Sequence, residues 1–286
     1  MFKDSFLTSP IRSGLPSNPH HSILSGKSGL RVIADVHGQS TAFERVIGDA
    51  SDLNLAVLCL GDLVGRGPDS PGVVRLMLDL IASGNGIFVP GNHCDAFRRA
   101  LPGAIASSSR GGDTMRQFSE TQDGARLAFA FAEAVAQAPL WIRIGSGLFT
   151  HAAFHPRMLD ECHPVVCGDP AARSSLAGMR ALQGEMDGRV CSSGRLVNSY
   201  AWCDQIPAGI TVYVGHDVTP TGAVMLRHGR SGGTAVSLDT GAWTRGDVSF
   251  LDLSLQDLAL EPFSASATLP VGHDRVVGSL GLMPAA

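Results

Sequence analysis

The chain contains 286 residues, of which 44% are hydrophobic and 17% are charged, and its formal net charge at pH 7 is −4. This composition excludes an intrinsically disordered, collagen-like or disulfide-scaffold protein. A globular chain of this length removes roughly 75% of its unfolded surface from water, so its core is large enough to hold a rigid site. The mild acidic balance argues against nonspecific binding to nucleic acid or a membrane surface, since both need a basic face.

The cysteines and the apolar segments indicate the compartment. Six cysteines occur without the regular spacing of a disulfide framework: Cys59, Cys94, Cys162, Cys167, Cys191 and Cys203. We therefore expect free thiols in a reducing compartment. The N-terminal residues contain no apolar core of the kind found in signal peptides, and no later segment has about 20 consecutive apolar residues. These features predict a cytoplasmic protein without a membrane span.

In the first half of the chain, short apolar runs alternate with segments of helical periodicity. Strands are predicted at 30–34, 55–60 and 86–89, and helices at 41–50, 71–83, 95–101 and 124–137. This alternation predicts an α/β sheet whose strands are joined by helices.

The second half is richer in strands. They are predicted at 141–144, 148–150, 210–214, 235–238 and 248–253, which indicates a second sheet. Residues 152–209 have few apolar runs, and we interpret them as a cap-like insertion. Residues 1–28, rich in Ser, Pro, Gly and His, are expected to form a flexible arm. The main domain is then expected at 29–255, followed by a C-terminal extension at 256–286.

Polar residues that can bind a metal follow the ends of five predicted strands. They are Asp35 and His37, then Asp62, then Asn92 and His93, then His151, and finally His216. Any one of them alone would be interpreted as a turn or capping residue. Ligand sites of open α/β folds lie at the carboxyl ends of strands, so five such motifs in succession indicate one shared site.

The residue types narrow the chemistry of this expected site. Asp, Asn and His offer oxygen and imidazole ligands without a thiolate, which suits manganese, iron, zinc or nickel. This many candidate ligands exceeds what one catalytic ion with open positions needs, but it fits two ions that share a carboxylate. Two ions roughly 3.5–4 Å apart are suited to phosphoester hydrolysis.

The ordered set of motifs resembles the signature of the calcineurin-like metallophosphoesterases, and more closely their phosphoprotein phosphatase branch and its bacterial relatives. The motifs are Asp35-Val36-His37-Gly38, Gly61-Asp62-Leu63-Val64-Gly65-Arg66-Gly67-Pro68, Gly91-Asn92-His93, Thr150-His151-Ala152 and Gly215-His216. The resemblance covers residues 30–255. It implies an α/β fold built on a two-layer β-sandwich flanked by helices, with an irregular cap region.

The resemblance also implies a ligand set for two divalent ions, with manganese expected first and iron, zinc or nickel as alternatives. One ion would be bound by Asp35, His37 and Asp62. The other would be bound by Asp62, Asn92, His151 and His216, so that Asp62 bridges the two.

Further roles follow from the same resemblance. His93 would be the general acid that protonates the departing oxygen, and an imidazole is suited to that role near neutral pH. Arg66 would bind the phosphate, for which a planar guanidinium with five donors is suited. Asn92 would also contact the substrate. A hydroxide bridging the two ions would then attack phosphorus in line with the leaving group, without a covalent enzyme intermediate.

The family has a second phosphate-binding arginine in the region before the last metal histidine. The candidates are Arg157, Arg173, Arg180, Arg189 and Arg195. The stretch from Arg195 to Trp202 resembles the corresponding family segment best, so Arg195 is expected to be a catalytic and substrate-binding residue.

One departure from the pattern bears on the substrate. Gly65 stands where protein Ser/Thr phosphatases carry an Asp that supports the acid histidine. Asp69 or Asp95 could take its place. Symmetrical diadenosine tetraphosphatases also lack this Asp, and the run at 66–75 resembles the phosphatase module of bacterial polynucleotide kinase-phosphatases.

We therefore expect a hydrolase of phosphomonoesters, including phosphoserine and phosphothreonine in proteins. The alternatives are hydrolysis of diadenosine tetraphosphate or related nucleotides, and removal of phosphate from nucleic-acid ends. A non-catalytic metal-binding module is an alternative of another class. The expected partners are phosphorylated small molecules, nucleotides or phosphoproteins, with no broad nucleic-acid surface and no membrane; the oligomeric state is not predicted.

Overall fold

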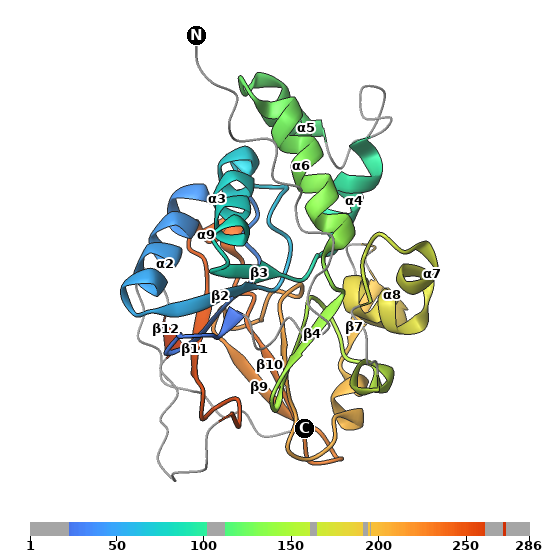
Figure 1. Cartoon of the computed structure of the whole chain (residues 1–286). Helices are drawn as coiled ribbons and strands as arrows, with labels where there is room; N and C mark the ends of the chain where they lie inside the picture. The colour runs from blue at the N-terminus through green and yellow to red at the C-terminus, as the bar shows by residue number, and fades with distance from the viewer. Residues whose placement is uncertain are drawn as a thin grey trace.

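Two mixed five-stranded sheets form the centre of the protein (Figure 1). The computed structural model describes residues 23–101, 112–160, 165–190, 194, 196–260 and 271–272. A two-stranded hairpin forms a third, smaller sheet.

The first sheet has the order β12-β11-β1-β2-β3. Its strands are β1 (Gly29–Ile33), β2 (Leu55–Cys59), β3 (Gly86–Phe88), β11 (Phe250–Ser254) and β12 (Val271–Gly272). The strands β1, β2 and β3 are parallel, while β11 is antiparallel to both of its neighbours. Helices α2 (Ser40–Asp52) and α3 (Ser70–Ala82) make the connections between the parallel strands.

The second sheet has the order β4-β5-β8-β10-β9. Its strands are β4 (Trp141–Ile144), β5 (Gly147–Thr150), β8 (Thr211–Val214), β9 (Met225–His228) and β10 (Thr234–Ser237). The three central strands, β5, β8 and β10, are parallel, and the two edge strands are antiparallel to them. The expected second sheet is therefore present.

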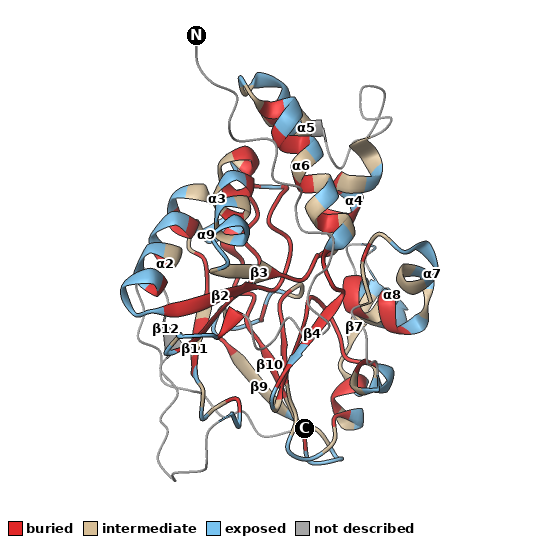
Figure 2. Ribbon diagram, in the orientation of Figure 1, coloured by how far each residue is buried: buried red, intermediate tan, exposed pale blue. Residues whose placement is uncertain are grey.

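Side chains of the two sheets meet in one apolar core. Alternate residues of a strand face opposite sides of its sheet. On the inner side, Leu30, Val32 and Leu58 of the first sheet belong to the same buried cluster as Phe149 and Tyr213 of the second. The outer residues of the same strands pack with the helices, so red, buried positions fill the strands and the inner helix faces in Figure 2. This is the expected two-layer β-sandwich flanked by helices.

Three helices follow β3 and pack on one another: α4 (Asn92–Ala100), α5 (Gly112–Glu120) and α6 (Gly124–Gln137). The ring of Phe97 in α4 lies 5.0 Å from that of Phe118 in α5 and 5.6 Å from that of Phe131 in α6. Phe131 in turn stacks on Phe88 of β3 at 6.2 Å. These aromatic contacts fix α4, and with it Asn92 at its first turn, against the first sheet.

The segment 152–209 consists of short elements. They are η2 (Pro156–Leu159), α7 (Pro170–Ser174), α8 (Leu176–Gln183), β6 (Glu185–Val190), β7 (Leu196–Ser199) and η3 (Ala201–Gln205). The side chain of Asp169 accepts from the amide of Ala171 at 2.9 Å and caps α7, and Ser175 caps α8 through the amide of Gly178 at 3.0 Å. Elements this short leave little periodicity, so their capping residues are the sequence signal that predicts them.

The packed structure extends beyond both expected domain boundaries. Ile23 and Leu24 are only 7% and 9% exposed and belong to the core between the sheets, so the expected arm cannot run to residue 28. Residues 1–22 lie outside the described residues. At the other end, β12 pairs with β11, and Leu258 is fully buried, so the segment after 255 contributes to the sandwich.

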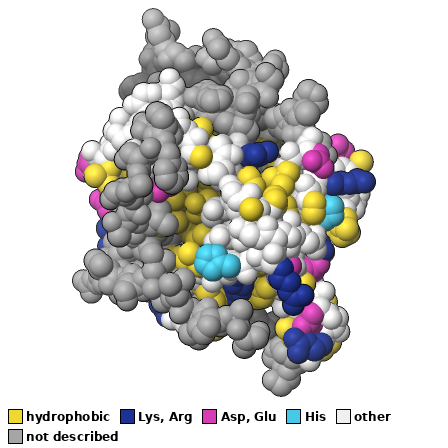
Figure 3. All heavy atoms as spheres, turned by 90° about the horizontal axis from the view of Figure 1, so that it is seen from below, with side chains coloured by type: hydrophobic (Ala, Val, Ile, Leu, Met, Phe, Trp, Pro, Cys, Tyr) yellow, Lys and Arg dark blue, Asp and Glu magenta, His cyan; other side chains and the backbone are white. Residues whose placement is uncertain are grey.

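The surface carries charge of both signs. On the face seen in Figure 3, Lys and Arg side chains are scattered among acidic and apolar ones, without a continuous basic area. Among the described helices, none is long and apolar enough to cross a membrane.

Four of the cysteines are free and buried: Cys59, Cys94, Cys167 and Cys203. Burial raises the pKa of the Cys59 and Cys94 thiols, which keeps them protonated near neutral pH. They therefore act as small apolar core residues. Cys162 and Cys191 lie outside the described residues.

Candidate functional site

Six parallel strands deliver polar residues to one edge of the sandwich. In the first sheet, the register places Ile33 beside Cys59 and Cys59 beside Phe88, so β1, β2 and β3 end at the same level. The residues that follow the six strands are Asp35, Asp62, Asn92, His151, His216 and Asp239. The first five come from the expected ligand set, and His37 lies beside them.

One half of the cluster is formed by His37 and two carboxylates. The Nε2 atom of His37 lies 3.7 Å from Oδ2 of Asp35 and 3.8 Å from Oδ2 of Asp62. Its Nδ1 atom lies 3.3 Å from the carbonyl of Val64, and because a carbonyl only accepts, Nδ1 carries the proton. The Nε2 lone pair of the neutral ring therefore faces the carboxylates. Oδ2 of Asp35 is buried without a hydrogen-bond partner.

The other half brings together two histidines and Asn92. The Nδ1 atom of His151 donates to the carbonyl of Leu60 at 2.8 Å, which leaves the Nε2 lone pair facing Oδ1 of Asn92 at 3.1 Å. The same Nε2 atom lies 3.6 Å from Oδ2 of Asp62. The Nδ1 atom of His216 lies 3.1 Å from both Asn92 Oδ1 and His151 Nε2. Asp62 thus adjoins both halves.

Burial sets the protonation of these groups. Burial raises the pKa of Asp35 well above its usual value, with the charges of Asp239 and Asp62 acting in the same direction. Burial also lowers the pKa of His37 and of His151 to about 4. At neutral pH these rings are uncharged, which is the form in which imidazole binds a metal.

These observations fit a divalent metal centre. Carboxylate oxygens, an amide oxygen and imidazole lone pairs converge with few donors among them, and one buried oxygen is left unpaired. A cation satisfies such a group of acceptors, and this donor set suits borderline divalent ions.

Two carboxylates are oriented by backbone amides from across the site. The amide of His93 donates to Oδ1 of Asp62 at 2.8 Å, and the amide of His216 donates to Oδ1 of Asp35 at 2.9 Å. Each amide follows a glycine by one or two residues. A Cβ at Gly91 would overlap Asp62 Oδ1, and one at Gly215 would overlap Asp35 Oδ1. The glycines in the two motifs are therefore required by this close approach.

The backbone at this edge is strained. Six described residues other than glycine have a positive φ, and four of them lie here: His37 (47°), Asp62 (41°), Arg66 (67°) and His216 (67°). Each such conformation costs about 1–3 kcal/mol and persists only where the surrounding structure fixes it. The strain is concentrated at the residues that form the cluster.

His93 lies beside the first half of the cluster. It is in the first turn of α4, and its ring makes an edge-to-face contact with that of His37, with centroids 4.9 Å apart. Gly65 adjoins its other side, since a Cβ there would lie 2.7 Å from Nδ1 of His93. Gly65 has no side chain, so no carboxylate reaches the His93 ring from this position.

Neither of the two carboxylates considered as substitutes reaches His93. Asp69 caps α3 by accepting from the amide of Gly72 at 2.9 Å. Asp95 is paired with Arg98 at 3.0 Å and with Arg99 at 2.9 Å. Within the described part of the chain, no carboxylate makes a hydrogen bond with the His93 ring.

Arg66 is exposed and follows Gly65 directly. Its charge acts to lower the pKa of Asp35 and of His37, although burial has the largest effect on both groups, so it lies within electrostatic reach of the cluster. Its guanidinium carbon is 4.9 Å from the centroid of the Trp243 ring. This position fits the expected contact with a phosphate.

The other candidate arginines have different surroundings. Arg195 lies outside the described residues, so its expected role stays a prediction. Arg173 lies 3.4 Å from Asp95, Arg180 pairs with Glu185, and Arg189 pairs with Asp187.

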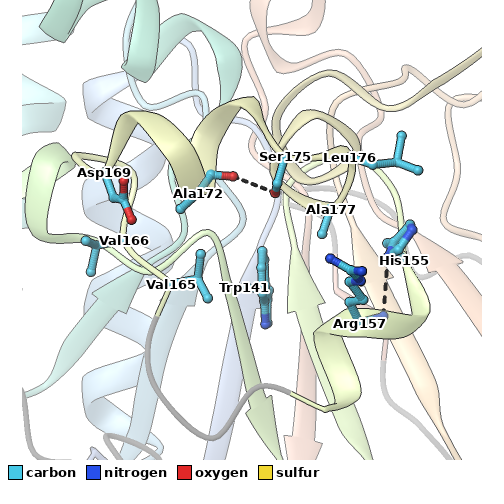
Figure 4. Close-up of a pocket in the computed structure, with 10 residues that line it drawn as sticks. All are labelled: Trp141, His155, Arg157, Val165, Val166, Asp169, Ala172, Ser175, Leu176 and Ala177. Carbon is cyan, nitrogen blue, oxygen red and sulfur yellow. Dashed lines mark hydrogen bonds between the residues drawn. The ribbon is translucent and has the colours of Figure 1, made fainter.

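Arg157 lines a separate cavity of about 530 Å³ (Figure 4). The cavity lies between β4 and the cap, and its lining consists of Trp141, His155, Arg157, Val165, Val166, Asp169, Ala172, Ser175, Leu176 and Ala177. None of these residues is an expected metal ligand. Arg157 and His155 lie near each other on one side of it, away from Asp169 (Figure 4).

Asp239 is a site residue that the sequence analysis did not single out. It follows β10, is 2% exposed, and accepts from the amide of Gly241 at 2.8 Å. Burial raises its pKa to about 6. The rule that identified the other residues, a polar residue at a strand end, also points to Asp239.

A second unassigned group adjoins His216. The hydroxyl of Tyr200 donates to Oδ2 of Asp217, and the guanidinium of Arg227 lies 3.6 Å from the centroid of the Tyr200 ring. This chain of contacts connects the end of the β6–β7 hairpin to the loop that carries His216.

Comparison with known proteins agrees with this geometry. Residues 30–163 match the family model described as calcineurin-like phosphoesterase. The chain is 25% identical over 215 residues to the asymmetrical bis(5′-nucleosyl)-tetraphosphatase PrpE of Anoxybacillus flavithermus, and the alignment covers 74% of this chain and 79% of the relative.

Solved structures of low sequence identity share the fold. A protein serine/threonine phosphatase from Saccharomyces cerevisiae matches with a TM-score of 0.57 at 15% identity, covering 93% of this chain and 91% of that one. A cold-active protein-tyrosine phosphatase of a psychrophilic Shewanella matches with a TM-score of 0.51 at 13% identity, covering 86% and 80%.

The contact between Gly91 and Asp62 predicts the effect of one added methyl group. In Gly91→Ala the new Cβ would meet Asp62 Oδ1 and would lie 2.6 Å from its amide nitrogen, so the carboxylate must turn. We expect this variant to lose most of the rise in Tm that Mn²⁺ gives the wild type, a stabilisation of about 2.7 kcal/mol at a hundred times Kd.

Gly48→Ala in α2 is the matched control, because its added Cβ meets no atom within 4 Å. It should keep the full Mn²⁺-dependent rise in a thermal-shift measurement. An equal rise in both variants would contradict the role of Gly91 in positioning Asp62.

Proposed function

We propose that this chain, whose residues 30–163 match the calcineurin-like phosphoesterase family model, hydrolyses phosphoanhydride bonds in dinucleoside polyphosphates. The observation that carries the choice of substrate is the glycine at position 65, beside the His93 ring, which offers no carboxylate to support that ring. The likeness to a bis(5′-nucleosyl)-tetraphosphatase supports the same choice. This ranks nucleotides above the phosphomonoesters that the sequence analysis put first.

The two halves of the cluster would hold two divalent ions. Asp35, His37 and Asp62 would bind one, and Asp62, Asn92, His151 and His216 the other. When bound, such ions supply Lewis-acid charge that polarises phosphoryl oxygens and acidifies water. Manganese is the first ion to test among those that suit this donor set.

The chain's own groups position the phosphate and move a proton. The Arg66 guanidinium would bind phosphoryl oxygens through its planar array of donors, and the Asn92 amide would contact the same group. His93, at the first turn of α4, would donate a proton from its ring to the departing oxygen.

The surroundings of His93 indicate which kind of leaving group the site is suited to expel. A hydrogen-bonded carboxylate orients a histidine ring for proton donation. Asp62 lies within 4.8 Å of the His93 ring, but among the described residues no carboxylate is hydrogen-bonded to it. An alcohol, such as the serine side chain, leaves as a strongly basic alkoxide and needs the proton. A nucleotide phosphate leaves as an anion whose conjugate acid has a pKa of about 6, so it needs the proton far less.

Phosphomonoesters are the second candidate. The presence of His93 favours them, because an acid residue is retained at the correct end of α4. The non-catalytic alternative is disfavoured, because all six expected metal ligands lie together.

A substrate panel tests this function. With Mn²⁺ present, we expect kcat/KM to be highest for diadenosine tetraphosphate. The value for a phosphoserine peptide should be lower, and that for a 3′-phosphorylated oligonucleotide should be the lowest of the three. Asp62→Asn should reduce activity by at least about 10²-fold because it removes the charged carboxylate expected to bind both ions. Asp49→Asn, a change of the same kind on the exposed side of α2, should leave it unchanged.

A higher kcat/KM for the phosphopeptide would support the second candidate instead. Absence of hydrolysis by the folded protein with every metal tried would support a non-catalytic module.

The role of His93 predicts a dependence on the leaving group. His93→Ala should lower kcat for an alkyl phosphate such as glycerol 3-phosphate by about 10²-fold or more, but lower it little for p-nitrophenyl phosphate, whose leaving group needs no proton. His228→Ala, at an exposed histidine of β9, is the control. Equal losses on both substrates would argue against an acid role for His93.

A further inference from the structure

Trp243 is a large aromatic side chain left exposed beside the candidate site. The other two tryptophans, Trp141 and Trp202, are 8% and 1% exposed, whereas Trp243 is 41% exposed. An indole ring has a large apolar face whose exposure to water is unfavourable. Its position therefore calls for an explanation.

The chain around Trp243 is tied to the end of β10. Helix α9 (Ala242–Arg245) starts directly after Gly241, whose φ is 89°. The amide of Gly241 donates to the buried carboxylate of Asp239, and the Thr244 hydroxyl donates to the Gly241 carbonyl at 2.9 Å. These bonds place Trp243 four residues after Asp239, at the edge of the sandwich where the cluster lies.

Arg66 connects Trp243 to the cluster. Its guanidinium carbon lies 4.9 Å from the centroid of the indole, a cation–π contact that fixes both side chains. Its charge also acts, after the larger effect of burial, to lower the pKa of His216. The side chain proposed to bind phosphate is thus also the one that stacks on the indole.

Val218 adds a second exposed apolar group on this side. It lies two residues after His216 and is 42% exposed. One of its methyl groups is 3.3 Å from the position of a Cβ at Gly241, so it packs at the start of α9. We name the Trp243 indole, with Arg66 over its ring and Val218 near the start of the same helix, the Trp243 platform.

We propose that Trp243 determines specificity by stacking on a nucleobase of the substrate while Arg66 binds the adjacent phosphate. This rests on the proposed function and names the part of the substrate that the site recognises beyond the phosphates. A nucleotide carries a flat ring and a phosphate in one molecule, and the platform places a flat apolar surface next to a phosphate-binding cation. Base stacking on an aromatic side chain is tolerant of base identity, so the platform should accept adenine and guanine alike.

Equilibrium binding tests the platform without hydrolysis. Isothermal titration of the Mn²⁺-loaded protein should give a Kd for adenosine monophosphate about tenfold lower than that for inorganic phosphate, as expected from stacking of one base. Trp243→Ala should abolish this difference, and Trp243→Phe should keep most of it. Phe129→Ala, at an aromatic residue of α6 that is 65% exposed, is the control and should behave as the wild type.

Steady-state kinetics provides the second measurement. The ratio of kcat/KM for diadenosine tetraphosphate to that for inorganic tripolyphosphate should fall about tenfold in Trp243→Ala, mainly through KM, because only the first substrate carries a base. The ratio should be kept in Trp243→Phe and Phe129→Ala.

The two measurements separate the possible failures. If the wild type binds both ligands equally, or if Trp243→Ala leaves the difference between them intact, the platform is wrong whatever the enzyme hydrolyses. If the binding difference depends on Trp243 but diadenosine tetraphosphate is not hydrolysed, the platform stands and the proposed function fails.

Discussion

The structure depends on the burial of two carboxylates, Asp35 and Asp62, among imidazole lone pairs. Removing an ionised carboxylate from water costs several kcal/mol even after relaxation, and two close together repel each other. Part of this cost is offset because each carboxylate accepts a hydrogen bond from a backbone amide in a loop across the site. What the protein groups leave unsatisfied, above all Oδ2 of Asp35, is the charge that a divalent ion would neutralise.

The arrangement of strands in the two sheets brings these groups together. Three parallel strands in each sheet end at one edge, so every turn after them meets the others there. Parallel strands need long connections, which the helices supply on the outer faces. The backbone strain at His37, Asp62 and His216 is tolerated because rigid strands on both sides fix these turns.

The apolar runs predicted the two sheets, and the polar motifs at the strand ends predicted the convergence of Asp35 with His216 from 181 residues away in the chain. The same rule extends to Asp239, which was not predicted as a site residue. The sequence could not predict contacts between side chains of different elements. Asp69 and Asp95 both have the residue type needed to support His93, but Asp69 caps α3 and Asp95 pairs with arginines. Short elements such as α7 and α8 lack periodicity. The burial of Ile23 and Leu24 depends on the core between the two sheets, which includes residues as far along the chain as Leu258.

The central claim is that this edge holds two divalent ions that share Asp62, and anomalous diffraction at the manganese edge from Mn²⁺-soaked crystals tests it most directly. The account predicts two peaks on either side of the Asp62 carboxylate. One would be contacted by Asp35 and His37, and the other by Asn92, His151 and His216. A single peak, or peaks only away from Asp62, would contradict it.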